Sequence, residues 1–88
     1  MFQLNSAGNG IFENTVAVKG QMIVGSSNNP QAGAALEILS TTGALLLPRL
    51  SDAQEGGVTG VNGMMYYNTI DNAVKAYVGG NWKAVVVA

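Results

Sequence analysis

The 88-residue sequence contains neither cysteine nor histidine. Without cysteine, no disulfide can stabilise this short chain. Without histidine, the commonest metal ligand, the usual acid-base group near neutral pH and every histidine-activated nucleophile are absent. We therefore expect no enzyme activity and no cofactor, and the stability of the chain has to come from another source.

Charge is also scarce. Only 10% of the residues are charged, whereas 48% are hydrophobic, against about 25% charged residues in an ordinary soluble domain. A chain of this length buries only about 60–65% of its extended surface when it folds alone. Because few ions remain to cover the exposed part, we infer that the chain associates with other chains.

The distribution of the basic residues argues against nucleic acid as a partner. Four basic side chains are scattered along the chain and form no cationic stripe for phosphates: Lys19, Arg49, Lys75 and Lys83. The longest apolar runs, 44–47 and 84–88, are far shorter than the roughly 18–20 residues that span a bilayer. The first residues also lack a basic segment followed by an apolar signal core. We expect no membrane partner.

Apolar residues recur with period two in short runs interrupted by glycine and asparagine, which is typical of strands and turns. The first half predicts strands over 11–18 and 21–24, with Phe12, Val16 and Val18 on one face. An ordered loop follows at 25–33, and apolar alternation resumes at 34–40.

The run Leu45-Leu46-Leu47 ends at Pro48. Proline lacks an N–H, so this segment is predicted at a sheet edge or as an extended arm. Ser51 and Gln54 have the spacing of a capping box, which predicts one short helical turn.

The last quarter predicts an antiparallel meander with strands over 63–69, 73–78 and 82–87, joined by turns at Asp71-Asn72 and Gly79-Gly80. Both faces of the final strand are apolar, so a second surface has to cover it. The predicted fold is all-β: a short-stranded, Gly/Asn-rich meander with a Leu-Leu-Leu-Pro arm and one helical turn.

Three blocks of the sequence resemble a module of phage fibre and spike proteins that also occurs in some secreted bacterial surface proteins. The blocks are 20–25 with the Ser/Asn/Pro loop after it, ALEI-STTGALLLPRL at 35–50 with Gln54, and NGMMYYNT at 62–69 with Tyr77 and GNW at 80–82. This resemblance implies an intertwined homotrimer, in which 20–88 form the trimeric module and 1–19 an N-terminal arm or strand segment.

A homotrimer supplies the cover that the single chain lacks. Its shared core is expected to hold Leu45, Leu46, Leu47, Val85 and Val87. Glu37 and Arg49 lie in otherwise apolar stretches. Either they form an ion pair between subunits that fixes the register, or their charged groups both reach solvent while the aliphatic parts of the side chains stay on apolar surface.

The resemblance implies a non-enzymatic virion structural protein at the surface of a phage particle, made in the host cytoplasm. The short length favours a capsid-decoration (cement) protein or a short head fibre, bound to the major capsid protein or a fibre base. Threefold valency lets weak contacts act together. An N-terminal arm could supply the apolar anchors Phe2, Leu4, Ile11 and Phe12.

The main alternative is a receptor-binding or tail-fibre module that recognises a host surface glycan through an aromatic platform of Tyr66, Tyr77 and Trp82. Their period-two placement favours packing instead. A secreted bacterial adhesion module and a glycan hydrolase with two convergent carboxylates are further alternatives. The acidic residues Asp52, Glu55 and Asp71 match no calcium-ligand spacing.

Overall fold

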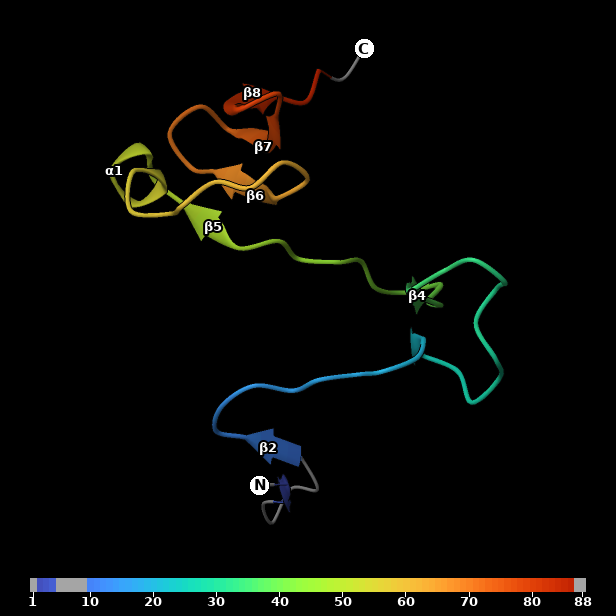
Figure 1. Ribbon diagram of the computed structural model, residues 1–88. Coiled ribbons are helices and arrows are strands. Elements are labelled where there is room, and N and C mark those ends of the chain that lie inside the picture. The colour runs from blue at the N-terminus through green and yellow to red at the C-terminus, as the bar shows by residue number, and fades with distance from the viewer. Residues whose placement is uncertain (1, 5–9, 87–88) are drawn as a thin grey trace. The chain divides into compact units, whose positions relative to one another are not determined.

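A computed structural model describes residues 2–4 and 10–86 of the chain (Figure 1). Within them, short strands predominate and the helix α1 spans a single turn, so the all-β prediction is confirmed. The chain divides into two units, Met1–Ala44 and Leu45–Ala88, which are described separately. The boundary after residue 19 stays a prediction.

The first unit begins with a small antiparallel pair, β1 (Phe2–Leu4) and β2 (Gly10–Phe12). The prediction of a strand over 11–18 is wrong beyond Phe12, because a ladder extends only as far as its partner and β1 has three residues. Val16 and Val18 lie in an irregular segment, where they are 52% and 50% exposed. They share no strand face with Phe12.

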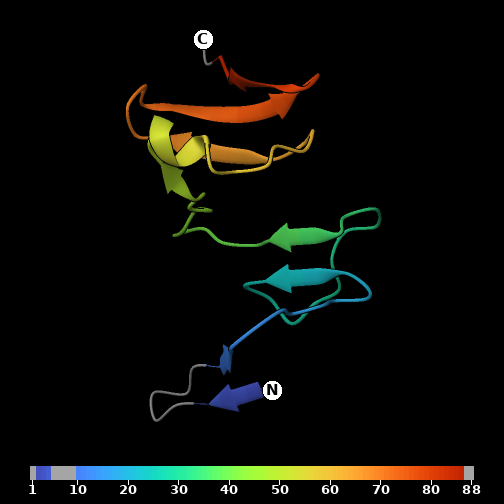
Figure 2. The same ribbon diagram turned by 60° about the vertical axis from the view of Figure 1, so that its left-hand side comes forward.

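The same unit contains a parallel pair, β3 (Met22–Val24) and β4 (Leu36–Ile38), whose arrows point the same way in Figure 2. Met22 lies opposite Leu36, and Val24 lies opposite Ile38. Two further main-chain bonds extend the ladder, from Met22 N–H to the Ala35 carbonyl at 2.9 Å and from Leu39 N–H to the Val24 carbonyl at 2.8 Å. The ordered loop that separates the two strands is the predicted one.

The second unit is a four-stranded sheet with the order β5-β6-β7-β8. The strands are β5 (Arg49–Leu50), β6 (Met65–Asn68), β7 (Ala73–Val78) and β8 (Asn81–Ala84). The last three form the predicted antiparallel meander, but the strands predicted over 63–69 and 82–87 are too long, because β6 spans only Met65–Asn68 and β8 ends at Ala84. β5 runs parallel to β6 at the sheet edge, which suits the proline just before it.

The turns of the meander follow from residues that tolerate positive φ. Gly79 and Gly80, with φ of 59° and 85°, form the two-residue link between β7 and β8, the geometry preferred by tight hairpins. Asn72, which precedes β7, also has a positive φ of 54°.

The helix α1 (Asp52–Glu55) begins with both halves of a capping box. The Ser51 hydroxyl accepts from the Gln54 N–H at 3.3 Å, and the Gln54 side-chain carbonyl accepts from the Ser51 N–H at 2.9 Å. Two of the N–H groups at the helix start are thereby satisfied. The helix ends at Glu55, and Gly56 is its C-cap residue.

The single chain has almost no core. Among the side chains of residues 10–86, the buried ones are Tyr66, 2% exposed, and Asn68, fully buried. Leu45, Leu46 and Val86 are 64%, 70% and 90% exposed. Most of the apolar surface that a small domain would bury therefore lies open in one copy of the chain.

Candidate functional site

The register of the meander sorts the side chains onto two faces. Tyr66 lies opposite Lys75, and Tyr77 lies opposite Trp82. Since residues directly opposite each other share a face, these side chains lie together on what we call the aromatic face. The other face carries the apolar side chains Met65, Tyr67, Val74, Ala76, Val78 and Val85, together with Asn81 and with Lys83 opposite Ala76. We call it the leucine face because Leu45–Leu47 border it.

On the aromatic face, three rings pack edge to face. The Trp82 ring centroid lies 4.9 Å from that of Tyr66 and 5.0 Å from that of Tyr77, at interplanar angles of 89° and 77°. This is a favourable geometry for aromatic packing. Because Tyr66 is only 2% exposed, its ring offers no face to a sugar, and an aromatic platform would have to rest on Tyr77 and Trp82.

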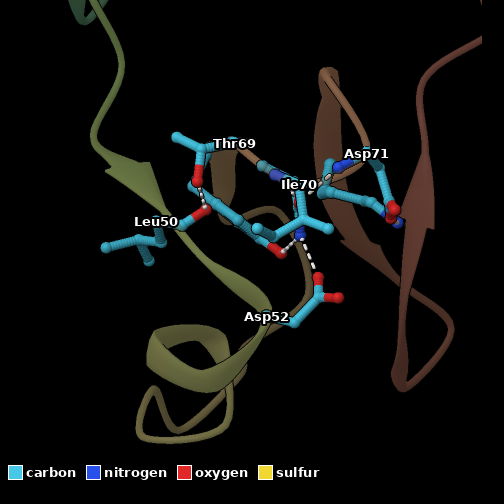
Figure 3. A network of polar contacts seen from close by, with 8 residues as sticks. Leu50, Asp52, Thr69, Ile70 and Asp71 are labelled. Carbon is cyan, nitrogen blue, oxygen red and sulfur yellow. Dashed lines mark hydrogen bonds and ion pairs between the residues drawn. The ribbon is translucent and has the colours of Figure 1, made fainter.

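The buried Asn68 side chain joins three parts of the second unit. Figure 3 shows the network and labels Asp52, Ile70 and Asp71 among its partners. Its Nδ2 donates to Asp52 Oδ1 at 2.7 Å and to the Tyr66 hydroxyl at 3.0 Å. Its Oδ1 accepts from the N–H groups of Ile70 and Asp71, both at 2.8 Å. Asn68 thus ties the start of α1, the aromatic face and the turn after β6 into one network.

Two neighbouring contacts reinforce this network. The Thr69 N–H and hydroxyl both donate to the Leu50 carbonyl, at 2.9 and 3.4 Å, which binds the end of β6 to β5. Lys75 Nζ lies 2.8 Å from Asp71 Oδ2. The hydrogen bond with Asp71 raises the pKa of Lys75. Burial raises the pKa of Tyr66, and its hydrogen bond with Asn68 partly opposes that shift.

The leucine face carries an apolar pocket of about 260 Å³ in the single chain. Its lining consists of Leu45, Leu46, Leu47, Arg49, Tyr67 and Val74. Val85, 41% exposed, donates its N–H to the Val74 carbonyl at 2.8 Å and so lies opposite Val74. The fold thereby brings the three leucines and Val85 to the same valine. Val87 lies outside the described residues.

A second pocket, of about 400 Å³, opens beside the aromatic face. Besides glycines and Val58, it is lined by Asp52, Glu55, Tyr77, Asn81 and Trp82. Within residues 2–4 and 10–86, no group of three or more acidic side chains is arranged to hold a metal ion. The same part of the chain contains no helix with the length and hydropathy for a membrane span.

The two charged residues predicted to pair between subunits belong to different units of the chain. Glu37 accepts from the Gln31 N–H at 2.6 Å, and Arg49 borders the leucine pocket. Their pairing between subunits stays a prediction.

The proposed anchoring arm maps onto the first antiparallel pair. Phe2 and Leu4 lie in β1, while Ile11 and Phe12 lie in β2 and are 41% and 46% exposed. Its role in attachment also stays a prediction.

Sequence reasoning missed the part played by Asn68. A signal for it exists, because asparagine just before a turn often accepts hydrogen bonds from the N–H groups two or three residues ahead. Its burial depends on α1 and on the tyrosine two positions earlier, which local pattern does not reveal.

These features define a small β module that has to complete its core with other chains. Residues 23–87 match the family described as the phage tail like trimerisation region, and the chain belongs to that family. The description assigns three-chain association and points to a structural role in phage particles rather than a catalytic one. No curated protein and no solved structure matches the chain.

Proposed function

We propose that this chain is a homotrimerising structural module at the outer surface of a phage virion. One observation carries the proposal: Tyr66 is the sole buried hydrophobic side chain among residues 10–86, while Leu45 and Leu46 are mostly exposed. Three leucine faces turned toward a common axis would give each copy the core that it lacks. The family match supports three copies rather than another number.

The energetics favour assembly in a single step. Full burial of a leucine side chain contributes about 1.5–3 kcal/mol. Association costs at least about 4–15 kcal/mol in lost translational and rotational freedom. One leucine per chain cannot offset that cost, so Leu45, Leu46, Leu47 and Val85 have to be buried together. The assembly should therefore be all-or-none, with little free folded monomer.

The test is the native mass of the chain. Light scattering after gel filtration, together with native mass spectrometry, should give about 27 kDa, three times the 9.0 kDa of one chain. A 9 kDa particle that melts cooperatively at micromolar concentration would show that the exposed leucines need no partner, and would refute the proposal.

For the place on the virion, we propose capsid decoration or a short head fibre, anchored through the β1–β2 pair to the major capsid protein or a fibre base. Exposed Ile11 and Phe12 support this role, since threefold valency multiplies weak apolar contacts. Gold labelling of virions should mark the head, and deletion of residues 1–12 should abolish attachment of an intact trimer. Labelling confined to the tail tip would contradict this placement.

A receptor-binding role is the second candidate, and the pocket beside Trp82 and Tyr77 favours it. Aromatic rings next to acidic and amide groups suit the apolar face and the hydroxyls of a sugar. Asn81 lines this pocket but takes no part in the ring packing. If the role is real, glycan-array binding should be lost in Asn81→Ala while the trimer persists. A trimer that binds no glycan on the array would eliminate this candidate.

A further inference from the structure

One face of the β3–β4 ladder is apolar, and its side chains are exposed in the part of the chain that the structure describes. Register and alternation place four side chains there, 38–53% exposed: Met22, Val24, Leu36 and Ile38. An isolated two-stranded sheet is only marginally stable in water unless other structure packs against it. This face belongs to the first unit, whereas the leucine face belongs to the second.

The reverse face is different, because the chain supplies its own contacts there. Ile23 lies opposite Glu37, and both are less exposed than their strand neighbours. The Glu37 carboxylate accepts from the Gln31 N–H at 2.6 Å. Gln21 Nε2 donates to the carbonyls of Gln31 and Ala34 at 3.0 and 2.7 Å. The connecting loop is thus held to the ladder, and Glu37 lies on the face opposite the four apolar side chains.

We propose that the face formed by Met22, Val24, Leu36 and Ile38 packs against the same face of two further copies, as a second trimer contact independent of the leucine face. Two observations indicate that this face is covered by other copies of the same chain. The family match extends over this ladder, from residue 23. The face itself carries no charged side chain, so it suits an equally apolar surface rather than a charged partner.

The consequence is a division of each strand into inner and outer positions. Leu36 and Ile38 approach their counterparts in the other copies, and Glu37 between them points away from the axis. The inference rests on the proposed trimer and deepens it, since it assigns a self-association role to a segment that the leucine face does not explain.

The absence of cysteine allows a direct test in the full chain. Three single-cysteine variants, Leu36→Cys, Glu37→Cys and Ile38→Cys, are treated with a short bis-maleimide and run on a denaturing gel. We expect cross-linked dimers for positions 36 and 38, up to about two thirds of the chains because one pair forms per trimer. Position 37 is the matched control and should remain uncross-linked.

The outcomes separate this inference from the proposed function. If the variants have the mass of a trimer but none is cross-linked, or if all three are cross-linked equally, the second contact is wrong and the trimer stands. If the unmodified chain has the mass of a monomer, the trimer fails and this contact fails with it. Two inner positions are used so that misfolding of one variant still leaves a measurable contrast with position 37.

Discussion

Replacement of Asn68 by alanine tests whether its network holds the second unit together. The substitution removes four hydrogen bonds at once: those to Asp52 and Tyr66, and those from the N–H groups of Ile70 and Asp71. It also leaves a space where a fully buried side chain was. Because one side chain bridges three elements, its loss should loosen α1, the aromatic face and the turn together.

The magnitude follows from the surroundings of each bond. A neutral hydrogen bond contributes about 0.5–1.5 kcal/mol and one to a carboxylate about 1.5–3 kcal/mol. The bond to Tyr66 is buried, whereas the bonds to Asp52, Ile70 and Asp71 are partly exposed, so water can replace part of the latter. We expect Asn68→Ala to lower the free energy of unfolding by about 2–4 kcal/mol per chain.

The assay is urea unfolding followed by circular dichroism, with all proteins at one chain concentration because assembly contributes to stability. Asn62→Ala is the matched control, since the Asn62 side chain makes one exposed hydrogen bond, from the Gly80 N–H at 3.0 Å. The control should lose less than about 1 kcal/mol. If the two variants were equally stable, the network around Asn68 would be of no energetic consequence.

A second substitution at this position separates shape from hydrogen bonding. Asn68→Asp keeps the side-chain volume and the oxygen that accepts from the turn. It replaces the Nδ2 donor by a second carboxylate oxygen, at the position from which Asn68 Nδ2 now donates to Asp52 Oδ1 over 2.7 Å. Repulsion should destabilise this variant at neutral pH. In acid, where one of the two carboxyl groups takes up a proton, part of the loss should be recovered. A loss that does not change with pH would rule out this repulsion.

The other predictions concern assembly, backbone geometry and pH. Leu46→Asp should destabilise the trimer by about 3 kcal/mol or more, so the variant should dissociate on dilution in analytical ultracentrifugation. The control Val16→Asp, which lies outside the family match, should not dissociate. If both variants behaved alike, Leu46 would lie outside the shared core. Gly25→Ala should lower the free energy of unfolding by more than about 1–2 kcal/mol, because Gly25 has φ of 96° and the added methyl group would collide with the Leu39 carbonyl. Thermal unfolding measures this loss, and an unchanged melting temperature would contradict it. Folding raises the pKa of Tyr66 above 10.0. The contribution of the neutral Tyr66 side chain to the free energy of unfolding is therefore fully present below pH 10.0, and it is lost as the pH rises through the folded-state pKa. Titration of phenolate absorbance should therefore show a late ionisation step from Tyr66, and this step should vanish in Tyr66→Phe.

Much of the second unit could be predicted from short-range chemistry. The capping pair Ser51 and Gln54 act over three residues, and Gly79 and Gly80 supply the positive φ that a two-residue hairpin needs. Pro48 removes a ladder donor and so limits the segment after it to a sheet edge. In each case the physical cause lies within a few residues of its effect, which is why pattern alone was sufficient.

The leucine face could be predicted only in part from the sequence. Scarcity of charge and a doubly apolar final strand predicted that a second surface was needed, without showing where it lies. The register of β7 against β8 places Val85 opposite Val74, and the pocket places Leu45–Leu47 at the same valine. The residues could be named from composition and pattern, but their convergence depends on strand pairing.

Pattern and composition thus established an all-β chain with a capped helical turn, a terminal meander and too few ions to cover its surface. Folding in three dimensions decided where the early strand stops, since Phe12 is the last residue with a partner in β1. It also decided the parallel pairing of β3 with β4 and the burial of Asn68. These depend on contacts between residues distant in the chain, and alternation specifies which face a side chain takes but not which strand lies beside it.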